Sequence, residues 1–321
     1  MSINTPYKVP QTKNLLLGIA LFAFQAFALF LLPIFLLPIS PYYLLLLLPI
    51  TLLTNTYWAL IHEAIHSNFH TNRALNERAA RGMAISFGTV FHLVRFGHLL
   101  HHQYNRTGID LTEGYDPKNE KHWAAQCRYY FQVFWGLYAT EIIGPIFLFL
   151  PRQLIVAIAE KLLAADSPHL SVGKKVLLKP SNLWKMRLDA IIMYVSLCVA
   201  FKLYGAWWPA LLAMIVIRGH LISFADNLPH YGTPIDDVRY SYNMNMPRLF
   251  QKLILNFNMH RIHHEYPNIP WTGLPQQFTA QKDVFDVNYF VQGWRQWRGV
   301  IPIEQLNAKT LKPAQKGALA S

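Results

Sequence analysis

The stretch LLLGIALFAFQAFALFLLPIFLL, from Leu15 to Leu37, decides the class of this protein because it contains no charged residue. A helix rises about 1.5 Å per residue, so a stretch of this length can cross a hydrocarbon core of about 30 Å. It runs through the turn-like PISP at 38–41 into a second apolar stretch, Tyr42 to Ile61. A signal peptide has a shorter apolar core and a cleavage site after it, so we interpret the pair as a retained transmembrane hairpin.

A second hairpin follows later in the chain. Met186 to Tyr204 and Trp207 to Phe224 are both apolar, and Gly205-Ala206 joins them. The two hairpins predict an all-α integral membrane protein with four transmembrane helices in a single membrane domain that covers residues 1–321. We expect the rest of the chain to form a helical cytosolic cap, from residues 62–185 and 225–300, and a tail at 301–321.

Lysine and arginine residues predict the orientation. They precede the first span at Lys8 and Lys13, precede the third span between Lys174 and Lys185, and are absent from the turns within both hairpins. The positive-inside rule therefore places both termini on the cytoplasmic side. Phe131 to Leu150 is also apolar, but a single crossing there would put the following lysines on the wrong face. We expect it to be an interfacial or re-entrant element.

Composition limits the class of partner. The chain has 321 residues, of which 53% are hydrophobic and 14% charged, with a formal net charge of +12. No run of basic residues with interleaved aromatics is present, so the charge does not predict nucleic-acid binding. Anionic lipid headgroups or an acidic electron carrier are the expected partners. The two cysteines, Cys127 and Cys198, supply neither a disulfide framework nor an iron–sulfur site.

Nine histidines gather in and near three short boxes. HEAIH at 62–66, HLLHH at 98–102 and HRIHH at 260–264 are the boxes, and DNLPH ends at His230. These histidines are His62, His66, His98, His101, His102, His230, His260, His263 and His264. One ion accepts about four to six ligands, so nine imidazoles predict two adjacent metals. Neutral nitrogen donors favour transition metals over magnesium or calcium.

HEAIH alone has a second interpretation. A helix places residues four apart on one face, and the same pattern is the zinc-protease signature with Glu63 as general base. Each HxxHH box, however, offers one histidine at i and two more at i+3 and i+4. A zinc protease uses three ligands and a water, and leaves no role for such pairs. The three boxes together favour a two-metal centre at the cytoplasmic ends of the spans.

The order HxxxH, HxxHH, transmembrane hairpin, HxxHH resembles the membrane fatty-acid desaturase and hydroxylase superfamily. The resemblance covers nearly the whole chain, from the first span to about Trp271. It implies two non-haem irons bound by the histidines, O₂ as co-substrate, and a further Asn-x-x-x-His site after the last span. Here that position reads Asp226-Asn227-Leu228-Pro229-His230, so Asp226 stands where the family has asparagine. We expect Asp226 to be the tenth ligand or to orient a histidine, with Asn227 as the alternative.

The resemblance implies an acyl desaturase that introduces a double bond into a fatty-acyl or lipid chain. Oxidising an unactivated C–H bond requires O₂ and two electrons, and no haem or flavin motif is present in the chain. A separate ferredoxin, rubredoxin or cytochrome-type donor is therefore implied. The boxes leave open oxidative decarboxylation to a terminal alkene and lipid or carotenoid hydroxylase or ketolase activity. A zinc metalloprotease and a metal transporter are the rivals from other classes.

Several other polar residues are candidates for supporting roles. Ligand histidines usually donate their second N–H to a carboxylate, and the acidic residues near the boxes are Glu63, Asp110, Glu113, Asp116 and Glu265. Among these we favour Asp110 and Asp116. His70 extends box one by a turn, but neighbouring asparagines predict a helix end there. His220, beside Arg218 on the last span, is a candidate for the substrate cavity.

Overall fold

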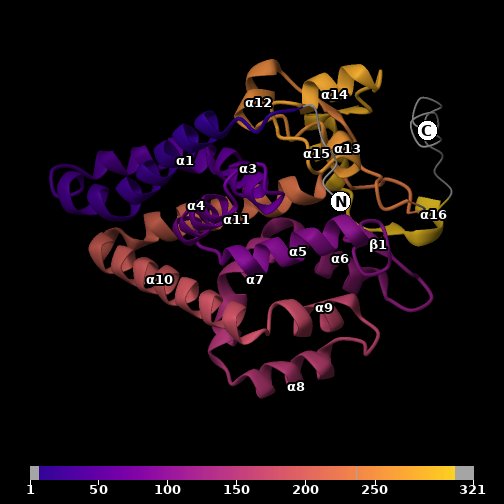
Figure 1. The fold of residues 1–321 in the computed structure, drawn as a ribbon, viewed down its shortest axis with the longest axis horizontal. Helices are drawn as coiled ribbons and strands as arrows, with labels where there is room; N and C mark the ends of the chain where they lie inside the picture. The colour runs from indigo at the N-terminus through magenta and orange to yellow at the C-terminus, as the bar shows by residue number, and fades with distance from the viewer. Residues whose placement is uncertain (1–6, 236, 308–321) are drawn as a thin grey trace.

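The computed structural model describes residues 7–235 and 237–307, and these are mostly helical. Figure 1 shows α1 and the α10–α11 pair extending toward one end of the molecule, with α13 to α16 gathered at the other end. The predicted tail at 301–321 is described only as far as residue 307. Those first seven tail residues form β4 (Ile301–Pro302) and α16 (Ile303–Asn307), so the ordered chain extends beyond the predicted boundary at residue 300.

The first predicted span is a continuous helix over 11–36. It consists of α1 (Gln11–Ala26) and η1 (Phe27–Leu36), the latter with π-helical hydrogen bonding around Pro33. Proline lacks an N–H and its ring collides with the preceding turn, which a wider π turn accommodates. The second predicted span is broken into η2 (Pro41–Leu46), α2 (Leu47–Leu52) and α3 (Thr54–Ile65), with a bend of 41° between 41–52 and 54–65.

Two shorter helices follow and form a sharp bend. α4 (Arg73–Phe87) begins at Asn72, whose side chain accepts from the Leu75 N–H at 3.0 Å. It ends at Gly88, which has φ +99°, a conformation that favours glycine. α5 (Phe91–Tyr104) then leaves at 100° to α4 and carries the second histidine box.

The predicted second hairpin is α10 (Pro180–Tyr204), η5 (Gly205–Trp207) and α11 (Trp208–Asn227). Gly205, at φ +50°, stands at the turn. Both arms contact α4: Arg81 pairs with Asp189 of α10 at 2.7 Å, and the Phe87 carbonyl accepts from Arg218 of α11 at 2.9 Å. The two arms therefore fold back along the same neighbour.

The apolar helical segment between the hairpins begins at His122, nine residues before the predicted start at Phe131. α6 (His122–Phe131), η3 (Gln132–Gly136), α7 (Leu137–Ile143) and η4 (Gly144–Phe149) form one helical run, followed by α8 (Arg152–Leu162) and α9 (Pro168–Val176). Its centre packs closely on α11, where a Cβ on Gly219 would lie 3.2 Å from Tyr138. By length and apolar character the run 122–149 is a candidate span, as are 11–36 and 180–227, and the two bent pairs raise the number from three to at most five. The expected count of four and the interfacial placement of residues 131–150 stay predictions.

The carboxyl-terminal part of the region predicted to form the cap, together with the loop after α5, is built from short elements, and we refer to this part as the cap. They are β1 (Gly114–Tyr115), β2 (Met244–Asn245), α12 (Arg248–Leu253), α13 (His260–Glu265), α14 (Leu274–Ala280), β3 (Val287–Asn288) and α15 (Tyr289–Gln296). β1 pairs with β4 and β2 with β3, both in parallel, so the cap contains two small sheets that the all-α prediction did not include.

The amino-terminal end of α1 lies beside the histidine boxes. The Asn14 side chain donates to the carbonyls of Asn68 and Phe69 at 3.1 and 2.9 Å, and accepts from the Trp271 indole at 2.9 Å. Asn68 follows box one, and Trp271 follows box three. The start of the first span and the histidine boxes therefore lie at one end of the bundle.

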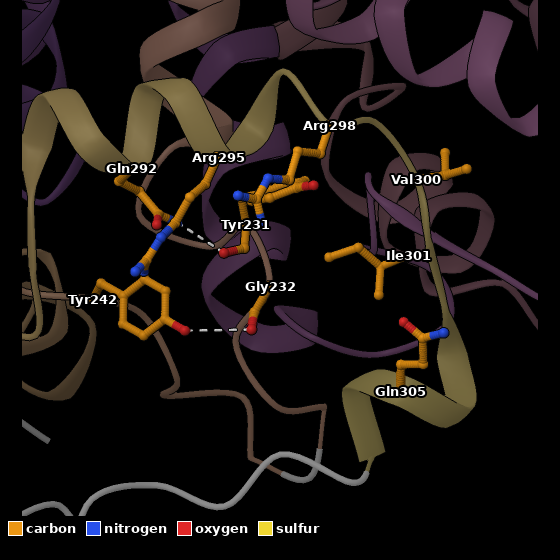
Figure 2. A pocket seen from close by; sticks show the side chains of 9 residues that line it. All are labelled: Tyr231, Gly232, Tyr242, Gln292, Arg295, Arg298, Val300, Ile301 and Gln305. Carbon is orange, nitrogen blue, oxygen red and sulfur yellow. Dashed lines mark hydrogen bonds between the residues drawn. The ribbon is translucent and has the colours of Figure 1, made fainter.

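A cavity of about 410 Å³ opens on the cap next to this end (Figure 2). Arg295 and Arg298 reach into it from the α15 side, and Gly232 lies on the opposite wall. The Gln292 side chain donates to the Tyr231 carbonyl at 2.8 Å, and this contact fixes α15 to the loop after His230. The cavity lining therefore begins at Tyr231, directly after the predicted ligand His230.

Candidate metal centre

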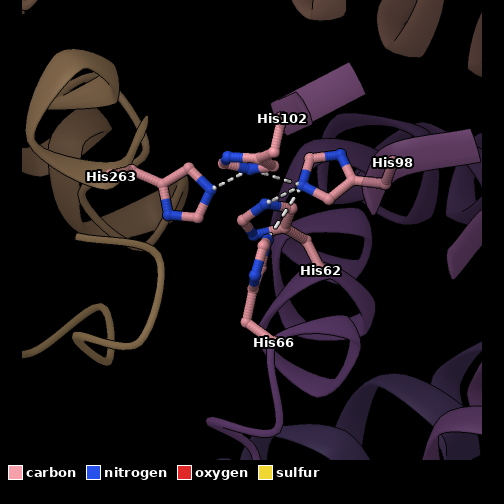
Figure 3. Close-up of side chains that lie close together, drawn as sticks. All are labelled: His62, His66, His98, His102 and His263. Carbon is pink, nitrogen blue, oxygen red and sulfur yellow. Dashed lines mark hydrogen bonds between the residues drawn. The ribbon is translucent and has the colours of Figure 1, made fainter. Parts of the chain in front are cut away.

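Five of the nine predicted ligand histidines point their Nε2 atoms into one small volume (Figure 3). The group consists of His62, His66, His98, His102 and His263, and its candidate ligand atoms all lie within 4.8 Å of one another. The first four come from α3, its carboxyl end and α5, whereas His263 comes from α13, over 150 residues later.

The distances within this group fit ligands of a common ion. Nε2 of His98 lies 2.9 Å from that of His62, 2.9 Å from that of His66 and 3.0 Å from that of His102. One imidazole nitrogen carries at most one proton, so it cannot share hydrogen bonds with all three. Two nitrogens that bind one transition metal at about 2.0–2.1 Å and at right angles lie about 2.9 Å apart. The geometry therefore suits a metal better than a hydrogen-bond network.

The remaining four histidines form a second group. It consists of His101, His230, His260 and His264, also with candidate ligand atoms within 4.8 Å of one another. Nε2 of His260 lies 3.0 Å from that of His230 and 3.2 Å from that of His264. The rings of His102 and His264, one from each group, stack at 4.2 Å between centroids, so the two groups are neighbours.

Each HxxHH box divides between the two groups in the same way. His98 and His102 are four apart and join the first group, while His101 joins the second. In box three the pair four apart, His260 and His264, joins the second group, and His263 crosses to the first. A helix places residues i and i+4 close in angle and turns i+3 and i+4 about 100° apart, which explains the division.

The electrostatics keep most of these imidazoles neutral. Burial lowers the pKa of His230, His260, His263 and His264 well below the usual range, and the neighbouring histidines lower it further. A neutral ring keeps a lone pair on its unprotonated nitrogen, and that lone pair is what a metal binds. The two groups could therefore each hold a metal ion at neutral pH.

Comparison with known protein families agrees with a metal site made of these histidines. A profile of the family described as Fatty acid desaturase matches residues 39–295, which include all three boxes and His230. The chain belongs to the fatty acid desaturase family. Membership implies an oxidoreductase that works on lipid in a membrane context, and the family generally uses a di-iron centre. Searches of curated proteins and of solved structures found no significant match.

Of the two carboxylates that the sequence favoured as supports of this desaturase-family site, one contacts a ligand histidine and the other does not. Asp110 accepts from Nδ1 of His101 at 2.6 Å, as expected of a residue that orients a ligand. Asp116 instead accepts from the Lys118 N–H and the Asn119 side chain at the surface of the cap. The sequence could not separate the two, because both follow box two in a loop.

The other predicted carboxylates hold the backbone around the site. Glu113 is fully buried, pairs with Arg106 at 2.9 Å and accepts from the Gly232 N–H at 2.7 Å, so it fixes the turn after His230. Glu63 accepts from the Trp271 N–H at 3.0 Å rather than from a histidine. This contact also removes it from the general-base position that the zinc-protease interpretation requires.

Asp226 belongs to neither histidine group. It lines a small, mainly apolar pocket of about 30 Å³ next to the centre, together with Trp58, Ala59 and Phe257. Its role as a tenth ligand stays a prediction. Asn227 donates to the Gln296 side chain at 3.1 Å, which directs its amide toward α15. Of the two neighbours, Asp226 is the one on the side of the pocket.

Sequence reasoning missed two supports of the centre. The Phe257 ring lies 4.7 Å from that of His62 and 4.5 Å from that of His260, so it touches both groups. Arg261, inside box three, pairs with Asp286 at 2.7 Å and also with Asp283, which anchors α13. No spacing pattern pointed to these two partners, which lie 22 and 25 residues away from Arg261.

His70 and His220, the two other candidate histidines, lie outside both groups. Nδ1 of His70 accepts from the Asn72 N–H at 2.9 Å, which agrees with the predicted helix end. His220 stacks on Phe134 of η3 at 5.1 Å between centroids and does not line the pocket beside the centre. Glu265 lies near Gln281 at 3.5 Å rather than near a ligand ring.

Proposed function

We propose that this protein is an O₂-dependent di-iron oxidase of lipid chains, and that its reaction is the introduction of a double bond into a fatty-acyl chain. The observation that carries the proposal is the convergence of five and four imidazoles on two neighbouring points. That number and kind of donor suits two transition metals with positions left for O₂. Family membership makes iron the metal of choice.

In this proposal, His62, His66, His98, His102 and His263 hold one iron. His101, His230, His260 and His264 hold the other, and Asp226 is the candidate tenth ligand. The irons supply the oxidant formed from O₂. Desaturation removes two hydrogen atoms from the chain and reduces O₂ to two waters, so a separate carrier must supply two electrons and the solvent two protons. We propose a ferredoxin, rubredoxin or cytochrome as that carrier.

The chain's own residues exclude water and orient the substrate. Phe257 touches both histidine groups and also lines the apolar pocket, so this pocket marks the side from which an acyl chain approaches. Trp58, Ala59, Ile222 and Met244 complete walls that suit methylene groups. Fixing the chain against these walls selects the carbon attacked, because a misplacement of about 1 Å can cost about 100-fold in rate.

The test is to express the full chain with a surrogate reductase in a bacterial host and to profile lipids and volatile products by mass spectrometry. A new double bond that disappears in His263→Ala would support the proposal. A hydroxylated lipid, or a hydrocarbon one carbon shorter, would select hydroxylation or decarboxylation instead. An iron-loaded, folded protein that leaves all lipids unchanged with several donors would contradict a lipid oxidase.

A further inference from the structure

Helix α15 has its apolar side chains on the wrong face for a helix of a water-exposed cap. Phe290, Val291 and Trp294 are exposed, with Trp294 at 74%. Gln292 and Gln296 face the protein and are buried at 1% and 0%. A helix that packs on a soluble core buries its apolar face, whereas one that lies in a membrane surface exposes it to lipid. This arrangement predicts an apolar surrounding for the exposed face.

Helix α12 extends the same surface. Leu249, Phe250 and Leu253 are exposed, and the Phe250 ring lies 6.3 Å from that of Phe290. We refer to the combined surface as the apolar rim. It consists of Leu249, Phe250, Leu253, Phe290, Val291, Trp294 and Trp297. Contiguous exposed apolar surfaces of this kind mark contacts with membranes or other proteins.

Basic residues flank the apolar rim. Arg248 and Lys252 lie on α12, and Arg295 and Arg298 reach into the 410 Å³ cavity beside α15 (Figure 2). Within the part of the chain that the structure describes, none of these four has a carboxylate partner within 4 Å. Trp and Phe on one face with arginine at its border is the pattern of helices that lie in an anionic lipid surface.

The apolar rim adjoins a candidate span. Trp297 lies 5.1 Å from Phe134 of η3 and 5.8 Å from Phe224 of α11, measured between ring centroids. Phe224 lies three residues before the end of α11, where the chain leaves the bundle for the cap. The rim therefore lies at the height where a membrane would meet the cap.

The apolar rim also adjoins the pocket beside the metal centre. Tyr289, at the start of α15, and Ile254, which follows α12, both line that pocket. Phe257 lines the same pocket, so Tyr289 and Ile254 connect the rim to the side chain that touches both histidine groups. A surface that served only to dock an electron carrier would not need this connection.

We propose that the apolar rim inserts into the membrane leaflet on the cap side, that Arg295 and Arg298 bind anionic lipid headgroups there, and that lipid chains reach the pocket between α12 and α15. The last clause rests on the proposed function, whereas the insertion and the headgroup contact do not. The partner is a lipid surface, since both the apolar area and its basic border match one.

Insertion can be measured with spin labels on the full chain in phosphatidylglycerol vesicles, without substrate or turnover. Phe290→Cys and Trp294→Cys are placed in a Cys127→Ser/Cys198→Ser background, with Lys118→Cys on the cap as the control, since the Lys118 side chain is 81% exposed. We expect labels at 290 and 294 to collide with O₂ more than with a water-soluble nickel chelate, and the label at 118 to do the opposite.

Nickel accessibility at 290 and 294 equal to that at 118 would overturn the proposal. The same holds if the two labels become shielded only when an electron-carrier protein is added, because the rim would then be a protein-docking surface. Both readouts are independent of the reaction, so failure of the proposed function would leave them unchanged.

The headgroup contact has its own test. Arg295→Gln/Arg298→Gln is compared with Arg239→Gln, a cap arginine paired with Asp237, by native mass spectrometry of bound phosphatidylglycerol against phosphatidylcholine. Each basic residue at an anionic surface is worth about fivefold in affinity, so the double variant should lose about 30-fold of its preference for phosphatidylglycerol. An unchanged preference would overturn the headgroup assignment.

Discussion

Loss of one histidine should lower the metal content when it comes from the second group but not when it comes from the first. His230→Ala leaves the second group with three imidazoles, whereas His66→Ala leaves the first group with four, as many as the intact second group has. Four-ligand metal sites in small proteins are worth about 10–16 kcal/mol, so one ligand corresponds to about 3–4 kcal/mol and more than about 100-fold in affinity. We expect His230→Ala to retain about one metal per chain and His66→Ala about two.

The assay is metal analysis of purified, folded protein after dialysis against a weak chelator. His70→Ala serves as the control, because His70 lies outside both groups and only accepts from the Asn72 N–H. Circular dichroism checks that each variant keeps its helices. Equal metal loss in His230→Ala and His66→Ala, or full retention in both, would refute the division into five and four ligands.

Three further outcomes follow from single contacts. Asp110→Asn removes the carboxylate that orients His101, so metal affinity should fall about 10–100-fold, as measured by competition with a chelator. Arg81→Met leaves the buried α10 carboxylate unpaired and should cost about 3–5 kcal/mol of stability in thermal unfolding, whereas exposed Arg78→Met should cost little. Ala59→Leu fills the pocket beside the centre and should shift the product profile toward shorter chains without changing metal content.

The sequence was sufficient to predict the parts of the molecule in which residue types recur at a regular spacing. Apolar stretches located the helices of both hairpins, and the box spacing named eight of the nine histidines that gather in the two groups, with His230 added by the DNLPH stretch. With the structure in hand, helical geometry also explains why His101 and His263 each belong to a different group from the other histidines of their box. The sequence did not predict which group each histidine joins, because that depends on how α3, α5 and α13 are placed relative to one another.

Features that depend on packing could not be read from the residue pattern. The run 122–149 begins with the more polar stretch HWAAQCRYY at 122–130, so its extent to His122 was not expected. Likewise, α15 reads as an ordinary amphipathic helix, and only the structure identifies which of its faces is covered. Glu113 was a candidate from the sequence, but the way it and Arg106 together hold the turn at Gly232 could be seen only in the fold.

Box two and box three each place ligands in both histidine groups from a single short helix. The spacing between the two centres is therefore set by the helical geometry of α5 and α13, which is rigid. It does not depend on loops, whose conformation varies more with temperature and sequence. A protein that carries one ion would still hold both helices in register. The histidines of the other group would therefore already be in place before the second ion binds.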